Sequence, residues 1–229
     1  MAGEFPCLLI QYEIKSIFFF TLIMYFYFTL IIYNLYMKKL LIKDNLNNDI
    51  NATLDVLKKF QLQSNNIFYK LCESSIRAIQ KKNKILFFGN GGSAADSQHL
   101  ATEITVRFKK NRRALPAISL ATDTSALTAI GNDFNFNKIF SRQIEAIGYK
   151  GDIAIGITTS GNSQNILEAC KSCKKKKILF FALSGNDGGK LIKHTKNIIK
   201  IPSKETSVIQ TVEILIGQTL CKIIEKNLT

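Results

Sequence analysis

The chain has 229 residues, of which 46% are hydrophobic and 21% charged, with 13 glycines and 3 prolines. This composition excludes a collagen-like or wholly disordered chain and predicts one domain of ordinary size with a substantial core. Five cysteines are too few for a disulfide scaffold. They indicate free thiols in a reducing compartment, so we expect a cytoplasmic protein.

The chain is strongly basic, with 31 Lys and Arg residues against 17 Asp and Glu and a formal net charge of +14. An excess of this size is compatible with a nucleic acid, a membrane surface or an anionic small substrate. The lysines are scattered, and residues 174–177 form the one dense run. We therefore favour a compositional bias and expect no nucleic-acid partner.

Residues 1–36 differ in character from the rest, since no charged residue lies between Lys15 and Lys38. As a helix, residues 16–37 would extend roughly 33 Å, which is enough to cross a bilayer. The lysines that follow would leave the remainder in the cytoplasm. A secretory signal is disfavoured, because no small-residue cleavage site ends the apolar run. Two interpretations remain: a membrane anchor, or a non-native extension upstream of a start at Met37.

We favour the second interpretation, in which residues 37–229 form a single domain and residues 1–36 are not part of the protein. A membrane is then a partner only if residues 1–36 are real.

The remainder alternates helical and strand patterns. Residues 48–81 carry apolar side chains near a period of 3.6 and predict one helix. Residues 84–89 form a short apolar run that ends at glycine, which is typical of a buried strand. Similar runs begin at residues 116, 152, 177 and 197, and helices are expected between them, including residues 94–108 and a helix around 166–170. This alternation predicts an α/β fold, with a parallel sheet covered by helices on both faces and an added N-terminal helix.

Two loops stand where a strand ends and a helix begins, which is where open parallel sheets bind ligands. Their glycines allow close backbone approach, and the helix N-termini favour an anion. Hydroxyls at such a position also serve as helix caps, but the second loop has more than a cap needs. We therefore favour a phosphate site; neither loop is a nucleotide-binding signature. The loops are residues 89–93 (GNGGS) and 158–163 (TTSGNS).

His99 and Glu103 are four residues apart on the helix after the first loop, so they share a face. Such a pair is usually a surface contact, but beside a phosphate loop it becomes a candidate metal or acid–base pair. His194 lies in a polar stretch and is expected to be exposed. Cys170 and Cys173 are expected to pack within a helix rather than bind zinc.

Three segments, GNGGSAADSQHLATEITVRF, ISLATDTSALTAIGND and GITTSGNSQNILEA, resemble the phosphoheptose isomerases, a branch of the sugar isomerase (SIS) fold. The similarity extends over residues 48–228. It implies a flavodoxin-like five-stranded parallel sheet and a homotetramer with active sites between subunits. The implied reaction converts sedoheptulose 7-phosphate to D-glycero-D-manno-heptose 7-phosphate through an enediol, for surface heptose in lipopolysaccharide or capsule.

The resemblance also implies roles for residues at matching positions. The residues expected to line the sugar-phosphate pocket are Asn90, Gly91, Gly92 and Ser93. Those holding the phosphate are Thr158, Thr159, Ser160 and Ser163, while Asn132 and Asp133 contact the sugar. Glu103 matches the catalytic base and contacts substrate, as does Gln210. The positions that match the ligands of one zinc ion per subunit are His99, Glu103, Gln210 and Gln218.

The last helix departs from the family pattern R-I-Q-E-x-H, which is followed five residues later by a catalytic, zinc-binding histidine. Here residues 208–213 read VIQTVE, and the later position is Gln218. Glutamine offers a carbonyl oxygen but does not titrate near neutral pH. A related paralogue, the replication-initiator-associating protein, keeps the fold without the isomerase residues. A non-catalytic binding protein is therefore the alternative, and the intact loops and Glu103 favour the isomerase.

The interpretation of residues 1–36 makes a prediction. Intact-mass analysis of the protein made from its native gene is expected to show a chain that begins at Met37. Peptides from residues 16–36 in a membrane fraction would contradict this and favour the anchor.

Overall fold

The five apolar runs form one parallel sheet. The computed structural model describes residues 5–63 and 66–228. The strand order is β2-β1-β3-β4-β5, so the expected flavodoxin-like α/β fold with five parallel strands is confirmed. The strands are β1 (Ile85–Gly89), β2 (Ala117–Ser119), β3 (Ile153–Thr158), β4 (Leu179–Gly185) and β5 (Ile198–Ile201).

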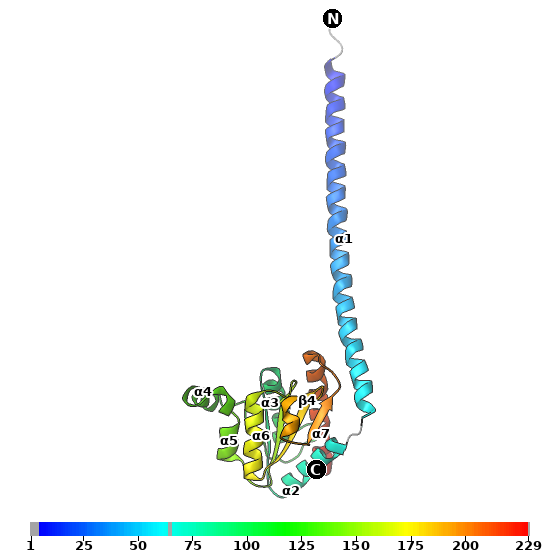
Figure 1. Ribbon diagram of the computed structural model, residues 1–229. Helices are drawn as coiled ribbons and strands as arrows, with labels where there is room; N and C mark the ends of the chain where they lie inside the picture. Colours follow the sequence, from blue (N-terminus) through cyan, green and yellow to red (C-terminus); the bar gives the residue numbers. More distant parts are fainter. Residues whose placement is uncertain (1–4, 64–65, 229) are drawn as a thin grey trace. The chain divides into compact units, whose positions relative to one another are not determined.

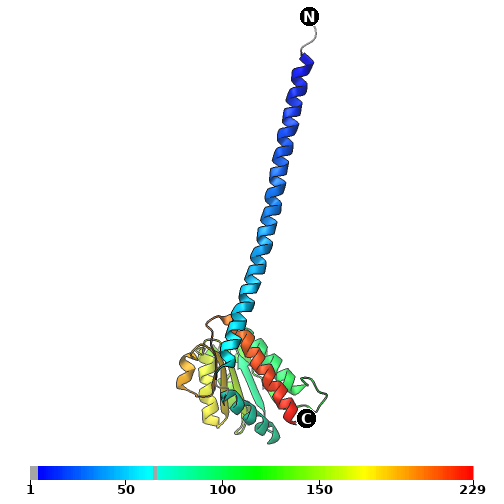
Figure 2. The ribbon, with the colours of Figure 1, turned by 90° about the vertical axis from the view of Figure 1, so that its right-hand side faces the viewer.

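Two apolar cores lie on the two faces of this sheet, because successive strand side chains point to opposite sides. Ile85 and Phe87 belong to one cluster, and Leu86 and Phe88 belong to the other. The first face is covered by α2 (Asn66–Gln80), α3 (Gly92–Thr105) and α7 (Thr206–Leu228), and the second by α5 (Ser141–Ile147) and α6 (Gln164–Lys176). Figure 2 shows α7, the red helix, across one face of the sheet.

The remaining short elements connect these layers. Helix α4 (Thr124–Asp133) contains no buried residue, and Figure 1 shows it at the edge of the domain, beyond α5. Two 3₁₀ helices follow later in the chain, η1 (Phe136–Lys138) and η2 (Gly189–Lys193). The position of η2 between β4 and β5 is important for the site described below.

The prediction of one helix over residues 48–81 is wrong. The first helix, α1, extends over Phe5–Gln61 and ends inside that range. It ends at Gln61, where a tight turn closes through a hydrogen bond from the Gln63 N–H to the Phe60 carbonyl. Leu62, which the apolar pattern placed on a buried face, is 88% exposed. The pattern therefore covers two helices, α1 and α2. Residues 64–66 are Ser, Asn and Asn, which favour turns and helix ends over helix interiors.

The chain divides into two compact units with a boundary between Asn51 and Ala52. The last turns of α1 belong to the second unit, where Val56 and Phe60 pack in the core. Among the described residues, two helices are long and apolar enough to cross a membrane. One is α1 from Phe18 onward, whose large apolar side chains are exposed, and the other is α7, which is half-buried as a core helix.

Helix α3 ends earlier than predicted, at Thr105 rather than at residue 108. The buried carboxylate of Glu225 on α7 binds the backbone N–H groups of residues 108–110 at 2.9–3.1 Å and Arg112 Nε at 3.1 Å. Burial alone would raise the pKa of Glu225, but these donors hold it below its ordinary value. Because these N–H groups bind a carboxylate, they cannot continue the α3 helix.

Helices α3 and α7 approach each other closely at two glycines. A Cβ at Gly217 would lie 2.4 Å from Leu100 Cδ1, and one at Gly92 would lie 2.7 Å from Gln210 Nε2. Real Cβ atoms do not come this close, so a larger residue at Gly217 would displace the buried Leu100 side chain, and one at Gly92 would displace the end of the Gln210 side chain.

A carboxyl group without a partner lies in the same interface. Glu213 is fully buried, and neither of its carboxylate oxygens has a hydrogen-bond partner among the described residues. Burial, and then the nearby Asp96 carboxylate on α3, raise the pKa of Glu213 from 4.5 to about 8. Glu213 is therefore protonated at neutral pH in the folded chain.

Replacing Glu213 by Gln is expected to reduce the pH dependence of the free energy of unfolding. In the folded state Glu213 holds its proton up to about pH 8, whereas the unfolded chain releases it near pH 4.5. The free energy of unfolding of the wild type therefore falls as pH rises through this window, by on the order of 4 kcal/mol in total. Thermal unfolding at about pH 5 and pH 8.5 measures the change.

The matched control is Glu73→Gln, which alters an exposed carboxylate on α2 that pairs with Arg77. Its stability should follow the wild type at both pH values. Equal pH dependence in the wild type and Glu213→Gln would contradict the prediction.

Candidate active site

The two predicted loops lie side by side at the carboxyl ends of neighbouring strands. In the parallel pair β1 and β3, Gly89 lies opposite Ile157, so the two strands end at the same edge of the sheet. Asn90 and Asn165 join the loops, since each amide donates to the other's oxygen, at 3.0 and 2.8 Å. Asn165 is buried and was not among the predicted site residues. These paired bonds fix the two loops relative to each other.

The first loop leads directly into α3. Gly91 has φ +55°, a conformation that favours glycine, and it precedes the helix without any side-chain cap. Gly92 is exposed and Ser93 is buried. The Gln210 side chain of α7 lies over Gly92. The N-terminus of α3 therefore presents backbone N–H groups that no side chain caps, as an anion site requires.

The hydroxyls of the second loop are not used to cap α6. Ser163 is the N-cap residue, yet its side chain makes no capping hydrogen bond. Its Oγ lies 3.5 Å from Oγ1 of Thr158, which ends β3 and is buried. Ser160 is exposed, and its Oγ accepts a hydrogen bond from the Asn162 N–H. With Thr159 between them, these hydroxyls are available for a ligand, so the capping explanation does not account for them.

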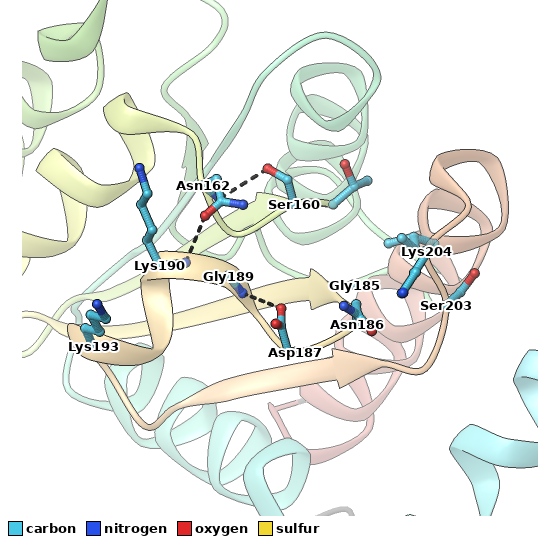
Figure 3. A pocket seen from close by; sticks show the side chains of 12 residues that line it. Ser160, Asn162, Gly185, Asn186, Asp187, Gly189, Lys190, Lys193, Ser203 and Lys204 are labelled. Carbon is cyan, nitrogen blue, oxygen red and sulfur yellow. Dashed lines mark hydrogen bonds between the residues drawn. The ribbon is translucent and has the colours of Figure 1, made fainter.

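A third loop, which sequence analysis missed, completes a pocket of about 510 Å³. It follows β4, and its backbone lies so close to the second loop that a Cβ at Gly161 would lie 2.1 Å from the Gly188 oxygen. Figure 3 shows Ser160 and Asn162 facing this loop, with Asn162 Oδ1 accepting from the Lys190 N–H at 2.9 Å. The residues that line the pocket include Thr159, Ser160, Asn186, Asp187, Lys190, Lys193, Ser203 and Lys204.

The signal for this third loop was present in the sequence. Residues 185–189 read GNDGG directly after a strand, the same arrangement as in the first loop. Lys190 and Lys193 of this loop, with Lys204 after β5, add positive charge beside the hydroxyls, which favours an anionic ligand.

The proposed acid–base pair lies further along α3. His99 Nε2 and Glu103 Oε1 are 3.1 Å apart, and their side chains are 46% and 21% exposed. Arg112 Nη2 binds the Glu103 carbonyl at 2.8 Å and so fixes this end of α3. Gln218 is half-buried on α7, next to the Gly217 contact with α3. The two helices thus carry all four positions that the resemblance assigned to zinc.

The donor set of these positions fits zinc poorly. His99 and Glu103 are good zinc ligands, but Gln210 and Gln218 offer only neutral carboxamide oxygens. In residues 5–63 and 66–228, no group of three or more His, Cys, Asp and Glu side chains could hold a metal ion. We therefore derive no chemical step from a metal, and zinc binding stays a prediction of the resemblance.

Asn132 and Asp133 lie apart from the loops. They are exposed at the end of α4, where the Asn132 amide donates to the Asp133 carboxylate at 2.9 Å. They do not line the pocket formed by the second and third loops. Within one chain the structure does not bring them to that pocket.

Other sequence expectations can be compared directly. His194 is exposed, as expected. Cys170 and Cys173 are buried on α6, where they pack against the second face of the sheet. Both are free thiols, which agrees with the expected packing role.

The comparisons with known proteins agree with this fold. The model of the SIS domain matches residues 50–185. The chain is therefore an SIS-domain protein. It is 45% identical to the phosphoheptose isomerase of Aneurinibacillus thermoaerophilus over 81% of this chain and 92% of that protein. It is 51% identical to phosphoheptose isomerase 1 of Campylobacter jejuni over 69% and 82%.

A solved phosphoheptose isomerase from Neisseria gonorrhoeae is similar in structure, with a TM-score of 0.75 and 35% identity. The match covers 81% of this chain and 99% of that one. The chain belongs to the phosphoheptose isomerase family, and it is an isomerase.

The free hydroxyls of the second loop make a prediction. Replacing Ser160 and Ser163 together by Ala is expected to weaken the binding of a sugar 7-phosphate by about 2–4 kcal/mol, because charge-assisted hydrogen bonds are lost. Isothermal titration calorimetry measures the effect. The control, Ser125→Ala with Thr128→Ala, removes two hydroxyls from α4 and should leave the affinity unchanged. Unchanged affinity in the first variant would show that the loop does not hold the phosphate.

Proposed function

We propose that the protein isomerises sedoheptulose 7-phosphate to D-glycero-D-manno-heptose 7-phosphate. One observation carries this proposal. The hydroxyls of residues 158–163 do not cap α6, and this loop lies beside the glycine loop of residues 90–93. Together they offer backbone N–H groups and hydroxyls for a phosphate, and Glu103 lies further along α3, the helix that the glycine loop leads into. Relatives at 45–51% identity carry the name phosphoheptose isomerase, which supports the choice of a heptose phosphate.

The chemistry moves a carbonyl from C2 to C1 of the sugar. A base removes a proton from C1 to give an enediol, and the proton is then delivered to C2. Glu103 performs this transfer, and its hydrogen bond to His99 orients the carboxylate. The hydroxyl proton must also pass from O1 to O2, and solvent water relays it. Gln218 can donate a hydrogen bond to the developing oxyanion, but it cannot carry this proton.

Binding of the phosphate positions the substrate for this step. The phosphate lies on the second loop, with the lysines of the third loop around it, while Asn90 and Gln210 contact the sugar. Holding the remote phosphate fixes the reacting carbons near Glu103, which lowers the entropic cost of the reaction.

The expected homotetramer completes the site. Asn132 and Asp133 lie on α4, which has no buried residue, and Phe134 and Phe136 beside them are exposed. Packing of α4 against a second copy would bury these rings and bring the Asn–Asp pair to a neighbouring pocket. The enzyme then acts in the cytoplasm, supplying heptose for lipopolysaccharide or capsule.

The proposal predicts the behaviour of two variants. Glu103→Gln is expected to abolish turnover while sugar-phosphate binding remains, because the amide keeps the shape but cannot accept a proton. Gln218→His is expected to raise kcat by about 10²-fold, which is the range for one acid–base group. It should also tighten zinc binding, since imidazole is a better ligand than a carboxamide. Aldose formation from sedoheptulose 7-phosphate is the assay.

The same assay tests the alternative of a non-catalytic binding protein, which Gln218 favours. Wild-type turnover that survives Glu103→Gln would refute the proposed mechanism. The absence of turnover in both the wild type and Gln218→His would favour the binding protein.

A further inference from the structure

A second basic pocket lies between α6 and η2. Its volume is about 400 Å³, within the range of roughly 300–1,000 Å³ that is usual for small-ligand sites. Its lining is mostly basic and consists of Cys170, Lys171, Lys174, Lys175, Lys193 and His194. Lys193 lines both this pocket and the pocket of the candidate active site. We call this cavity the α6–η2 pocket.

The basic side chains of the α6–η2 pocket come from two separate segments. Lys171, Lys174 and Lys175 share one face of α6, because they are spaced three and four residues apart. Lys193 and His194 come from the end of η2. Lysines in the last turn of α6 interact favourably with the helix dipole. That effect does not explain why η2 brings further basic groups to the same cavity.

Little negative charge balances this cluster. Lys171 Nζ binds the Glu168 carboxylate at 2.7 Å. Within residues 5–63 and 66–228, the amines of Lys174, Lys175 and Lys193 have no hydrogen-bond or ion-pair partner. Like charges held this close repel one another, and a bound anion would relieve the repulsion.

The floor of the pocket is neutral. Cys170 is buried, and burial raises the pKa of its thiol to about 11, so it carries no charge at neutral pH. No carboxylate and no aromatic ring is among the described residues that line the pocket. A ligand must therefore accept hydrogen bonds from several ammonium groups and gains nothing from ring stacking.

We propose that the α6–η2 pocket binds an oligophosphate, either free or carried by a nucleotide, through Lys174, Lys175 and Lys193. Two or more linked phosphates present many acceptor oxygens and several charges in a row, which matches several separate lysine amines better than one phosphate does. This site lies beside the active site and shares Lys193 with it, but the proposal does not rest on the proposed isomerase activity.

Calorimetric titration of sodium pyrophosphate and sodium tripolyphosphate into the full-length protein tests the proposal. Saturable binding with one site per chain is expected when Ser160 and Ser163 are both replaced by Ala, which disables the phosphate loop of the active site, and inorganic phosphate should bind this site about tenfold more weakly or worse. The double variant Lys174→Gln with Lys175→Gln should weaken pyrophosphate binding by about tenfold or more. Absence of binding to the wild type would overturn the proposal.

The matched control is Lys222→Gln with Lys226→Gln, which removes the same charge from an exposed part of α7. This variant should bind pyrophosphate as the wild type does. An equal loss of affinity in both double variants would show a non-specific charge effect and refute the site.

Two further titrations complete the test. The first distinguishes binding in the α6–η2 pocket from binding in the active site, and the second distinguishes recognition of phosphate from recognition of a nucleotide base. Ser160→Ala with Ser163→Ala should keep the pyrophosphate binding that Lys174→Gln with Lys175→Gln weakens, and a complete loss of binding in the serine variant would assign the anion to the second loop instead. ATP should bind no more tightly than tripolyphosphate, because the lining offers nothing to a base. Much tighter ATP binding would contradict recognition through phosphate alone.

Discussion

The close contact between α3 and α7 is the constraint on which the site depends. Gly92 and Gly217 allow the two helices to approach until Gln210 lies directly on the first loop and Leu100 fills the space over Gly217. Glu225 fixes the far end of the pair by binding the backbone that follows α3. With both ends fixed, Gln210 and Gln218 on α7 are held on the same helix pair as His99 and Glu103 on α3.

This constraint gives meaning to the unusual residues of α7. The resemblance places histidines of the family at the positions where this chain has Glu213, a buried acid, and Gln218, an amide. Burial raises the pKa of Glu213 to about 8, so this acid holds its proton at neutral pH, whereas the Gln218 amide does not titrate.

The sequence predicted the sheet and both loops because each depends on local signals. Buried strands read as apolar runs, and glycines and hydroxyls at strand ends mark anion sites. Where the sequence failed, long-range contacts decided. The end of α3 depends on Glu225, more than a hundred residues away, and the break between α1 and α2 falls inside a continuous apolar period. Asn165 was missed because its partner, Asn90, comes beside it only once the strands are side by side. The third loop was missed although residues 185–189 carry a local glycine signal after a strand.

The reciprocal amide pair of Asn90 and Asn165 has an evolutionary consequence. Each side chain must donate and accept at once, and among the natural amino acids of this size only asparagine does both through an amide. A single substitution at either position removes two hydrogen bonds together, and a substitution of Asn90 leaves the buried amide of Asn165 unsatisfied. The two positions are therefore expected to change in concert.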